Sequence, residues 1–137
     1  MIMKTGLFLI GFMFFSLISY AQGPLTGTLV INKGEIYKNW GDKIDFEFTV
    51  KNAGTKPLDI KKVTGSCDCQ TTHESNIQTI QPGKTGVIKV TVDLKKSQLG
   101  NQVENGVINY DKSVIVVTNG KKEKYQLYTR ATIRIKN

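Results

Sequence analysis

The sequence predicts an all-β fold, an antiparallel β-sandwich, and three observations predict it. Apolar and polar residues alternate strictly in several short segments, which is the pattern of strands with one buried face. Turn-forming pairs such as Pro82-Gly83 and Asn119-Gly120 separate these segments. In residues 22–137 no segment repeats its apolar residues with the period of a helix. Many short alternating strands within about 100 residues are typical of a two-sheet sandwich.

The first 21 residues have the pattern of an export signal. Lys4 precedes a nearly unbroken apolar run from Leu7 to Ile18, which is short for a membrane span of about 20 residues. Ser19-Tyr20-Ala21 then supplies the small residues of a cleavage site. We therefore expect a mature chain that begins at Gln22, export to the periplasm or the cell surface, and a single domain over residues 22–137. An uncleaved N-terminal anchor is the alternative.

Strands are predicted where the period of two is clearest, in the segments 44–51, 88–94 and 125–135. Residues expected in the core are Phe46, Phe48, Val90, Val92, Leu127 and Ile133, and residues expected outside are Glu47, Lys89 and Arg134. Weaker strands are expected at 28–31, 58–63, 76–80, 107–110 and 114–118. The total of seven or eight strands predicts an immunoglobulin-like sandwich, with a flexible lead at 22–28 and a loop at 95–105.

The charge balance is basic, yet no recognition motif accompanies it. The chain has 19 lysines and arginines against 11 acidic residues, and only Arg130 and Arg134 are arginine. Because phosphate recognition usually relies on the two-pronged arginine side chain, nucleic acid is not an expected partner. We interpret the dispersed lysines as a solvated surface. Contact with anionic lipid headgroups of a membrane surface or with acidic glycans is the alternative.

The sequence contains no recognisable catalytic apparatus. His73 is the only histidine, the glycines fall at turns, and no pair of carboxylates forms an acid–base motif. We therefore expect a non-enzymatic module of the bacterial cell envelope that uses no cofactor. Its expected partner is another envelope or surface protein, because sandwiches commonly bind through edge strands and end loops.

Cys67 and Cys69 are the only cysteines, they lie one residue apart, and His73 follows them. An oxidising compartment favours a local bridge between them, although the geometry of a disulfide then requires a bend in the chain. Such a bridge would be easier to reduce than an ordinary structural one, which makes the two cysteines a candidate redox pair. Free thiols packed as small hydrophobes are one alternative. A soft metal ion, such as Cu(I) or Zn(II), held by Cys67, Cys69 and His73 is another.

Two aromatic residues are candidate binding residues. Trp40 is the only tryptophan and stands just before the first strong strand, where packing against the core is the simplest interpretation. The alternative is an exposed ring that binds sugar or a partner protein, together with an exposed tyrosine such as Tyr128. Carbohydrate binding is therefore a further, weaker hypothesis.

From Phe46 to Ala131 the order of short motifs resembles the bacterial domain-of-unknown-function family 1573. The matching motifs are Phe46-x-Phe48, Asn52-x-Gly54, Pro57-Leu58-x-Ile60, Ser66-Cys67-x-Cys69, Ile80-x-Pro82-Gly83 and Thr118-Asn119. The resemblance implies an exported immunoglobulin-like sandwich of the Hydin and major-sperm-protein kind, without an established activity. Asp68 and Gln70 depart from the Gly and Thr that members usually carry. The stretch from Gln102 to Tyr110 resembles an insertion, which makes it a plausible contact site.

Overall fold

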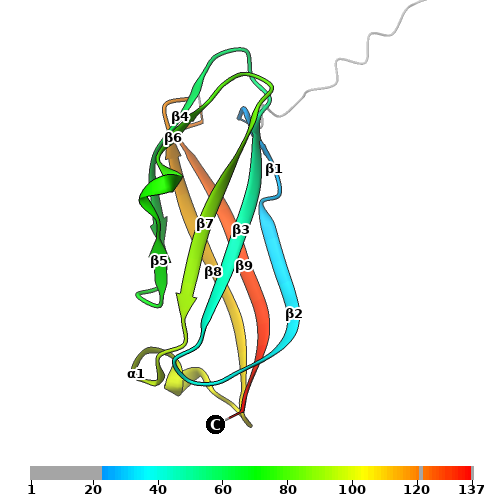
Figure 1. Ribbon diagram of the computed structural model, residues 1–137, viewed down its shortest axis with the longest axis vertical. Coiled ribbons are helices and arrows are strands. Elements are labelled where there is room, and N and C mark those ends of the chain that lie inside the picture. Colours follow the sequence, from blue (N-terminus) through cyan, green and yellow to red (C-terminus); the bar gives the residue numbers. More distant parts are fainter. Residues whose placement is uncertain (1–22, 121, 137) are drawn as a thin grey trace, which may run out of the picture.

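The computed structural model describes residues 23–120 and 122–136, which form nine strands in two stacked sheets (Figure 1). The expected export signal and its cleavage site lie outside the described residues. Within the described part of the chain, no helix is both long enough and apolar enough to span a membrane.

The first sheet contains four strands in the order β1-β3-β7-β5, and all neighbours are antiparallel. Their bounds are β1 Leu25–Gly27, β3 Lys43–Asn52, β7 Thr85–Asp93 and β5 Gln70–Thr72. The central pair β3 and β7 is in register from Lys43 opposite Asp93 to Lys51 opposite Thr85. Since the side-chain period of a strand is two, this register places the apolar residues of both strands on the same inner face.

The second sheet contains five strands in the order β2-β9-β8-β4-β6. Their bounds are β2 Val30–Lys38, β9 Lys124–Ile135, β8 Val107–Thr118, β4 Leu58–Gly65 and β6 Gln78–Ile80. The long hairpin of β8 and β9, drawn in orange and red in Figure 1, forms the centre of this sheet. The hairpin predicted at Asn119-Gly120 is confirmed, but its loop is longer than two residues, because the Thr118 N–H bonds to the Glu123 carbonyl at 2.7 Å.

The prediction of a wholly antiparallel sandwich of seven or eight strands is wrong in two respects. There are nine strands in the described residues, and β2 runs parallel to β9. The reason is that the first part of the chain changes sheets: β1 pairs with β3, and the chain then crosses to join β9 as β2. Gly27 permits this, because its φ is +105° and an added Cβ would lie 2.6 Å from the Thr49 carbonyl oxygen. The expected flexible lead therefore contains a strand.

The core lies between the two sheets and confirms the predicted register. The six residues expected inside, Phe46, Phe48, Val90, Val92, Leu127 and Ile133, are all fully buried. Glu47 and Arg134 are exposed, and Lys89 is half-buried. The alternation that is visible in the sequence thus identifies the inner face of each long strand.

The stretch from residue 95 to residue 110 is more ordered than the sequence suggested. It contains a short helix, α1 (Lys96–Leu99), and a 3-10 turn, η2 (Gly100–Gln102). Asn105 and Gly106 then have φ of +53° and +74° and form a two-residue turn that leads into β8. The two short strands expected at 107–110 and 114–118 are one strand, because β9 pairs with β8 without a break. Of the predicted insertion from Gln102 to Tyr110, the last four residues therefore belong to β8.

Candidate functional site

Cys67 and Cys69 lie in the connection between β4 and β5, where the chain passes from one sheet to the other (Figure 1). Their sulfurs form a disulfide bridge, and their Cα atoms are 5.1 Å apart. Cys69 is fully buried against the core, whereas Cys67 is half-buried. The two sulfurs of the bridge are therefore not equally accessible.

Gln70 holds the bend that the bridge requires. Its side-chain Oε1 accepts the backbone N–H groups of Ser66 at 2.8 Å and Cys67 at 3.2 Å. Its own backbone N–H donates to the Cys67 carbonyl at 3.0 Å. Gly65 leaves room for this side chain, since an added Cβ would lie 2.6 Å from Oε1. The departure from the family pattern at Gln70 thus has a structural role that sequence reasoning missed.

Tyr110 of β8 lies beneath the bridge. Its hydroxyl is 4.0 Å from Cys69 Sγ, and its ring stacks on Phe46 with 6.3 Å between the ring centroids. Burial raises the pKa of Tyr110 to about 12, so the hydroxyl remains protonated at neutral pH. The side chains of Gln70 and Thr129, which hydrogen-bond each other at 3.4 Å, lie beside this hydroxyl. A small polar cluster therefore borders the inner sulfur.

His73 is not part of this cluster. It follows β5, at the opposite end of that strand from Cys69, and its Nε2 is 2.8 Å from Thr91 Oγ1. The Thr91 hydroxyl donates to Asp45 Oδ1 at 2.6 Å, so Nε2 must carry the proton of the first bond. Among the described residues, no group of three or more His, Cys, Asp or Glu side chains could hold a metal ion. The structure thus does not assemble the metal ligand set considered from the sequence, because both thiols are in the bridge.

The two candidate aromatic residues lie apart. Trp40 is half-buried in the turn after β2 and packs against the core, in agreement with the simplest interpretation of the sequence. Tyr128 lies on the outer face of β9, where its hydroxyl donates to Gln126 at 2.7 Å and Arg130 lies 5.2 Å from its ring. Val30, at the start of β2, is the register partner of Tyr128, so most of the length of β2 separates the two rings. They do not form one binding surface.

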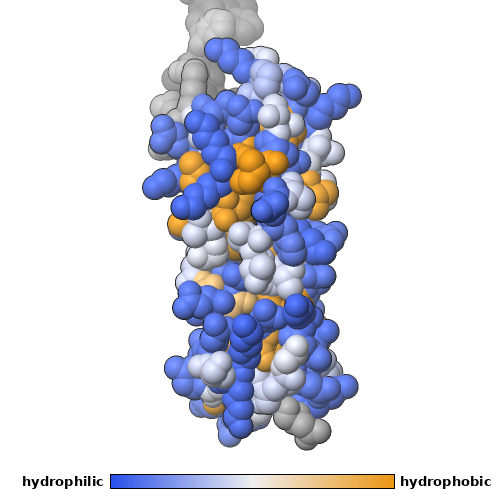
Figure 2. Space-filling view, turned by 60° about the vertical axis from the view of Figure 1, so that its left-hand side comes forward, coloured by the Kyte–Doolittle hydropathy of each residue, from blue (hydrophilic) through white to orange (hydrophobic). Residues whose placement is uncertain are grey.

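A surface that sequence reasoning missed lies where β6 approaches β7. Ile77 and Val87 are 54% and 49% exposed, although both are large and apolar. Figure 2 shows apolar side chains gathered in the upper half of this side of the molecule, among hydrophilic ones. We call this the edge surface; it consists of Ile77, Val87 and the hollow described below.

Two amide side chains hold Ile77 beside β7. Asn76, which is fully buried, exchanges two hydrogen bonds with the backbone of Lys89, and Gln78 Nε2 donates to the Val87 carbonyl at 3.0 Å. The segment from Asn76 to Gln78 therefore runs along β7 and leaves the Ile77 side chain outside. This position depends on contacts with a distant strand, so the sequence pattern around Ile77 carries no sign of it.

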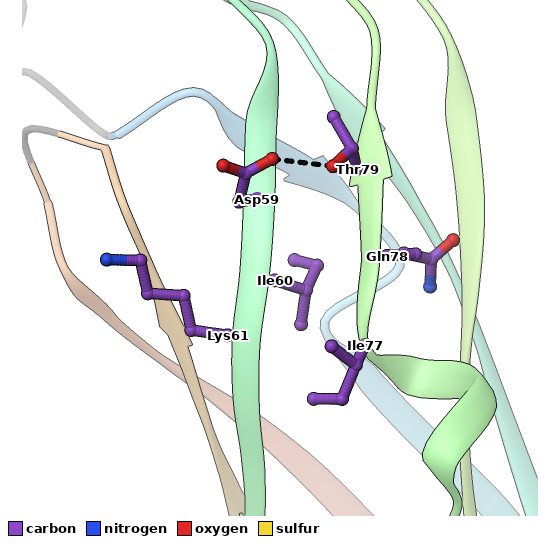
Figure 3. Close-up of a pocket in the computed structure, with 6 residues that line it drawn as sticks. All are labelled: Asp59, Ile60, Lys61, Ile77, Gln78 and Thr79. Carbon is purple, nitrogen blue, oxygen red and sulfur yellow. Dashed lines mark hydrogen bonds between the residues drawn. The ribbon is translucent and has the colours of Figure 1, made fainter.

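A hollow of about 490 Å³ adjoins Ile77, between β4 and β6 (Figure 3). Its lining residues are Asp59, Ile60, Lys61, Ile77, Gln78 and Thr79. The Asp59 carboxylate is already occupied, because it accepts the Thr79 hydroxyl at 2.6 Å and the Asn119 amide at 3.0 Å. Lys61 extends away from that pair, and in the described part of the chain it forms no ion pair. The hollow thus combines one exposed apolar side chain, that of Ile77, with one available positive charge, that of Lys61.

The two stacked sheets, with a first strand that changes sheets, define an immunoglobulin-like sandwich. The chain belongs to the family described as "Protein of unknown function (DUF1573)", whose profile matches residues 27–133. This confirms the resemblance seen in the sequence. No curated protein sequence matches the chain.

Solved structures of other proteins share this fold. A protein of unknown function from Porphyromonas gingivalis W83 is 17% identical with a TM-score of 0.60, over 85% of this chain and 50% of that chain. The VesB protease of Vibrio cholerae is 17% identical with a TM-score of 0.52, over 81% of this chain and 32% of that chain. PapD-like domain 7 of human CEP192 is 10% identical with a TM-score of 0.52, over 82% of this chain and 84% of that chain.

These similarities show the fold alone. This chain spans half of the Porphyromonas gingivalis protein and about a third of VesB. The proteolytic activity of VesB belongs to that protein, of which the shared fold is the smaller part.

Proposed function

We propose that this protein is a non-enzymatic interaction module of the bacterial cell envelope, which binds another exported protein through its edge surface. The observation that carries the proposal is the exposure of Ile77 and Val87 on neighbouring segments that hydrogen bonds hold together. Single exposed apolar residues are common, whereas apolar residues grouped on a surface with a polar rim are typical of binding sites. Residues 1–21 support the export part of the proposal.

The opposite edge of the sandwich is less suited to binding another chain. Its edge strand β2 is interrupted by a bulge at Lys33 and Gly34, where Gly34 has a φ of +68°. The Lys33 ammonium group lies 5.4 Å from the centre of the Phe46 ring, so a positive charge covers the gap between β2 and β3. Bulges and inward-pointing charges of this kind protect sheet edges from pairing with other chains.

The hollow indicates the chemistry of the partner. An apolar side chain of the partner would lie on the exposed Ile77, and a carboxylate next to it would pair with Lys61. The expected mature chain has 18 basic residues, because Lys4 is removed, against 11 acidic ones, and this formal net charge of +7 favours the approach of an acidic partner. The partner we propose is therefore a protein with an exposed apolar and acidic segment.

Larger proteins that contain a similar sandwich support an accessory role. In the Porphyromonas gingivalis protein and in VesB the similar part is 50% and 32% of the chain, so the sandwich accompanies other structure there. A sandwich that accompanies other domains is suited to positioning and binding.

Site-specific photo-cross-linking in the native cell tests the proposal. A photoreactive residue at position 77 should give a discrete adduct with an envelope protein, and the substitution Val87→Ser should reduce its yield. The matched control is the same photoreactive residue at position 37, because Tyr37 is a large aromatic residue that is 57% exposed but lies on the opposite edge strand. Adducts of equal yield from both positions, or none from position 77, would refute the proposed surface.

A further inference from the structure

The Cys67–Cys69 bridge presents its two sulfur atoms to different environments. Cys67 is half-buried, whereas Cys69 is fully buried in the core cluster. Thiol–disulfide exchange begins with the attack of a thiolate on one sulfur, and accessibility decides which sulfur is attacked. In this protein an incoming thiolate therefore reaches Cys67, and Cys69 becomes the leaving group.

The surroundings of Cys69 suit a leaving thiolate. The Tyr110 hydroxyl, 4.0 Å from Cys69 Sγ, can donate a hydrogen bond to the negative charge that develops there. Burial raises the pKa of Tyr110 to about 12, so the donor keeps its proton throughout the physiological range. A buried thiolate without such a donor would be strongly disfavoured.

The surroundings of Cys67 favour its own thiolate, which is needed when the bridge closes again. The backbone N–H of Cys69 donates to Cys67 Sγ at 3.1 Å, and a hydrogen bond of this kind stabilises a thiolate more than a thiol. The three hydrogen bonds of Gln70 hold the loop without help from the bridge, so the two sulfurs stay close after reduction. The site can therefore open and close without refolding of the sandwich.

The bridge contributes little as a structural staple. It links residues only two positions apart, and the entropy removed from the unfolded chain is smallest for such short loops. The pairing of β5 with β7 and the hydrogen bonds of Gln70 already fix this connection. A stabilising role thus leaves the position and the asymmetry of the bridge unexplained.

We propose that the Cys67–Cys69 bridge is a thiol–disulfide exchange site that oxidises a dithiol, with Cys67 as the attacked sulfur and Cys69 as the leaving sulfur. One thiolate of the dithiol attacks Cys67 Sγ, the Cys67–Cys69 bond breaks, and Cys69 leaves as a thiolate that then takes a proton. The second thiolate of the dithiol then attacks the dithiol sulfur that is bonded to Cys67. The bond to Cys67 Sγ breaks, and Cys67 leaves as a thiolate that takes a proton. Two electrons and two protons move from the dithiol to the two cysteines, and the dithiol becomes a disulfide.

The rate of bridge opening by dithiothreitol, measured on the folded full-length mature protein by alkylation and mass analysis, tests this proposal. We expect two thiols to appear while the circular dichroism spectrum stays that of the folded protein. Tyr110→Phe should slow the opening by about tenfold, the effect of losing one hydrogen bond to a charged group. The matched control is Tyr128→Phe, which removes a hydroxyl from the outer face of β9 and should leave the rate unchanged.

Single-cysteine variants identify the attacked sulfur. The variant Cys69→Ala retains the half-buried Cys67, which should form a mixed disulfide with oxidised glutathione at least about tenfold faster than the buried Cys69 of the variant Cys67→Ala. A bridge that dithiothreitol opens only when the protein unfolds would overturn the proposal. Faster reaction of Cys69, or an unchanged rate in Tyr110→Phe, would overturn the assigned roles of these residues.

Discussion

The side-chain amide of Asn76 pairs with the backbone of Lys89 as a neighbouring strand would. Its Oδ1 accepts the Lys89 N–H at 2.7 Å, and its Nδ2 donates to the Lys89 carbonyl at 2.8 Å. The strand β5 pairs with β7 only as far as Val90, so Asn76 continues the ladder by one residue. This contact fixes the segment that carries Ile77 and therefore positions the edge surface.

Asn76→Ala should destabilise the protein by about 1–3 kcal/mol, because it leaves the backbone N–H and carbonyl of Lys89 without their partners. The free energy of unfolding in urea measures the effect. The control Asn101→Ala changes an exposed asparagine and should cost less than about 0.5 kcal/mol. Equal urea concentrations at the midpoint of unfolding for the two variants would contradict the strand-like role of Asn76.

Phe48→Ala should cost about 3–5 kcal/mol, because Phe48 is fully buried and its loss leaves a cavity between the sheets. Its neighbour on β3, Glu47, is exposed, and Glu47→Ala should change the stability by less than about 0.5 kcal/mol. Urea denaturation of both variants provides the measurement. Similar stabilities would mean that the register of β3 is wrong.

Tyr110 should make the protein less stable at high pH. The phenol pKa is about 12 in the folded protein and about 10 in an unfolded chain, so the folded state holds the proton more tightly. The resulting stabilisation, on the order of 3 kcal/mol, is complete below about pH 10 and is lost as the pH rises to about 12. The unfolding free energy of the wild type should therefore fall more steeply over this range than that of Tyr110→Phe. Parallel pH profiles would contradict the raised pKa.

The mature protein should begin at Gln22, because Ser19 and Ala21 form a small-x-small site directly behind the apolar run. Intact-mass analysis of the protein from its native envelope checks this. Retention of Met1, or a start within β1, would contradict the predicted export signal.

The sequence predicted the strands and turns that depend only on residues close together in the chain. Alternation in the segments around Phe48, Val90 and Leu127 identified the buried faces, because a strand with one buried face carries a period of two. The Pro82-Gly83 turn was also correct, since Lys84 N–H bonds to the Gln81 carbonyl at 3.0 Å and Gly83 has a φ of +74°.

The remaining features depend on contacts between distant residues. The change of sheets after Gly27 depends on pairing with β3 and β9, and the exposure of Ile77 depends on the Asn76–Lys89 contact. A bridge between the cysteines was the preferred one of three interpretations of the sequence. Tyr110, 41 residues away from Cys69, comes beside the bridge only through the packing of the two sheets. Sequence patterns contain no information on such tertiary contacts.

The affinity of the protein for the envelope protein that cross-links at position 77 tests the central claim most directly. Val87→Ser and Val30→Ser form a matched pair, since the two valines are 49% and 45% exposed, but Val87 is part of the edge surface and Val30 lies on the edge strand β2. If the edge surface binds the partner, Val87→Ser should raise the Kd by about tenfold, and Val30→Ser should change it by less than about twofold. Equal Kd values for the two variants would contradict the account.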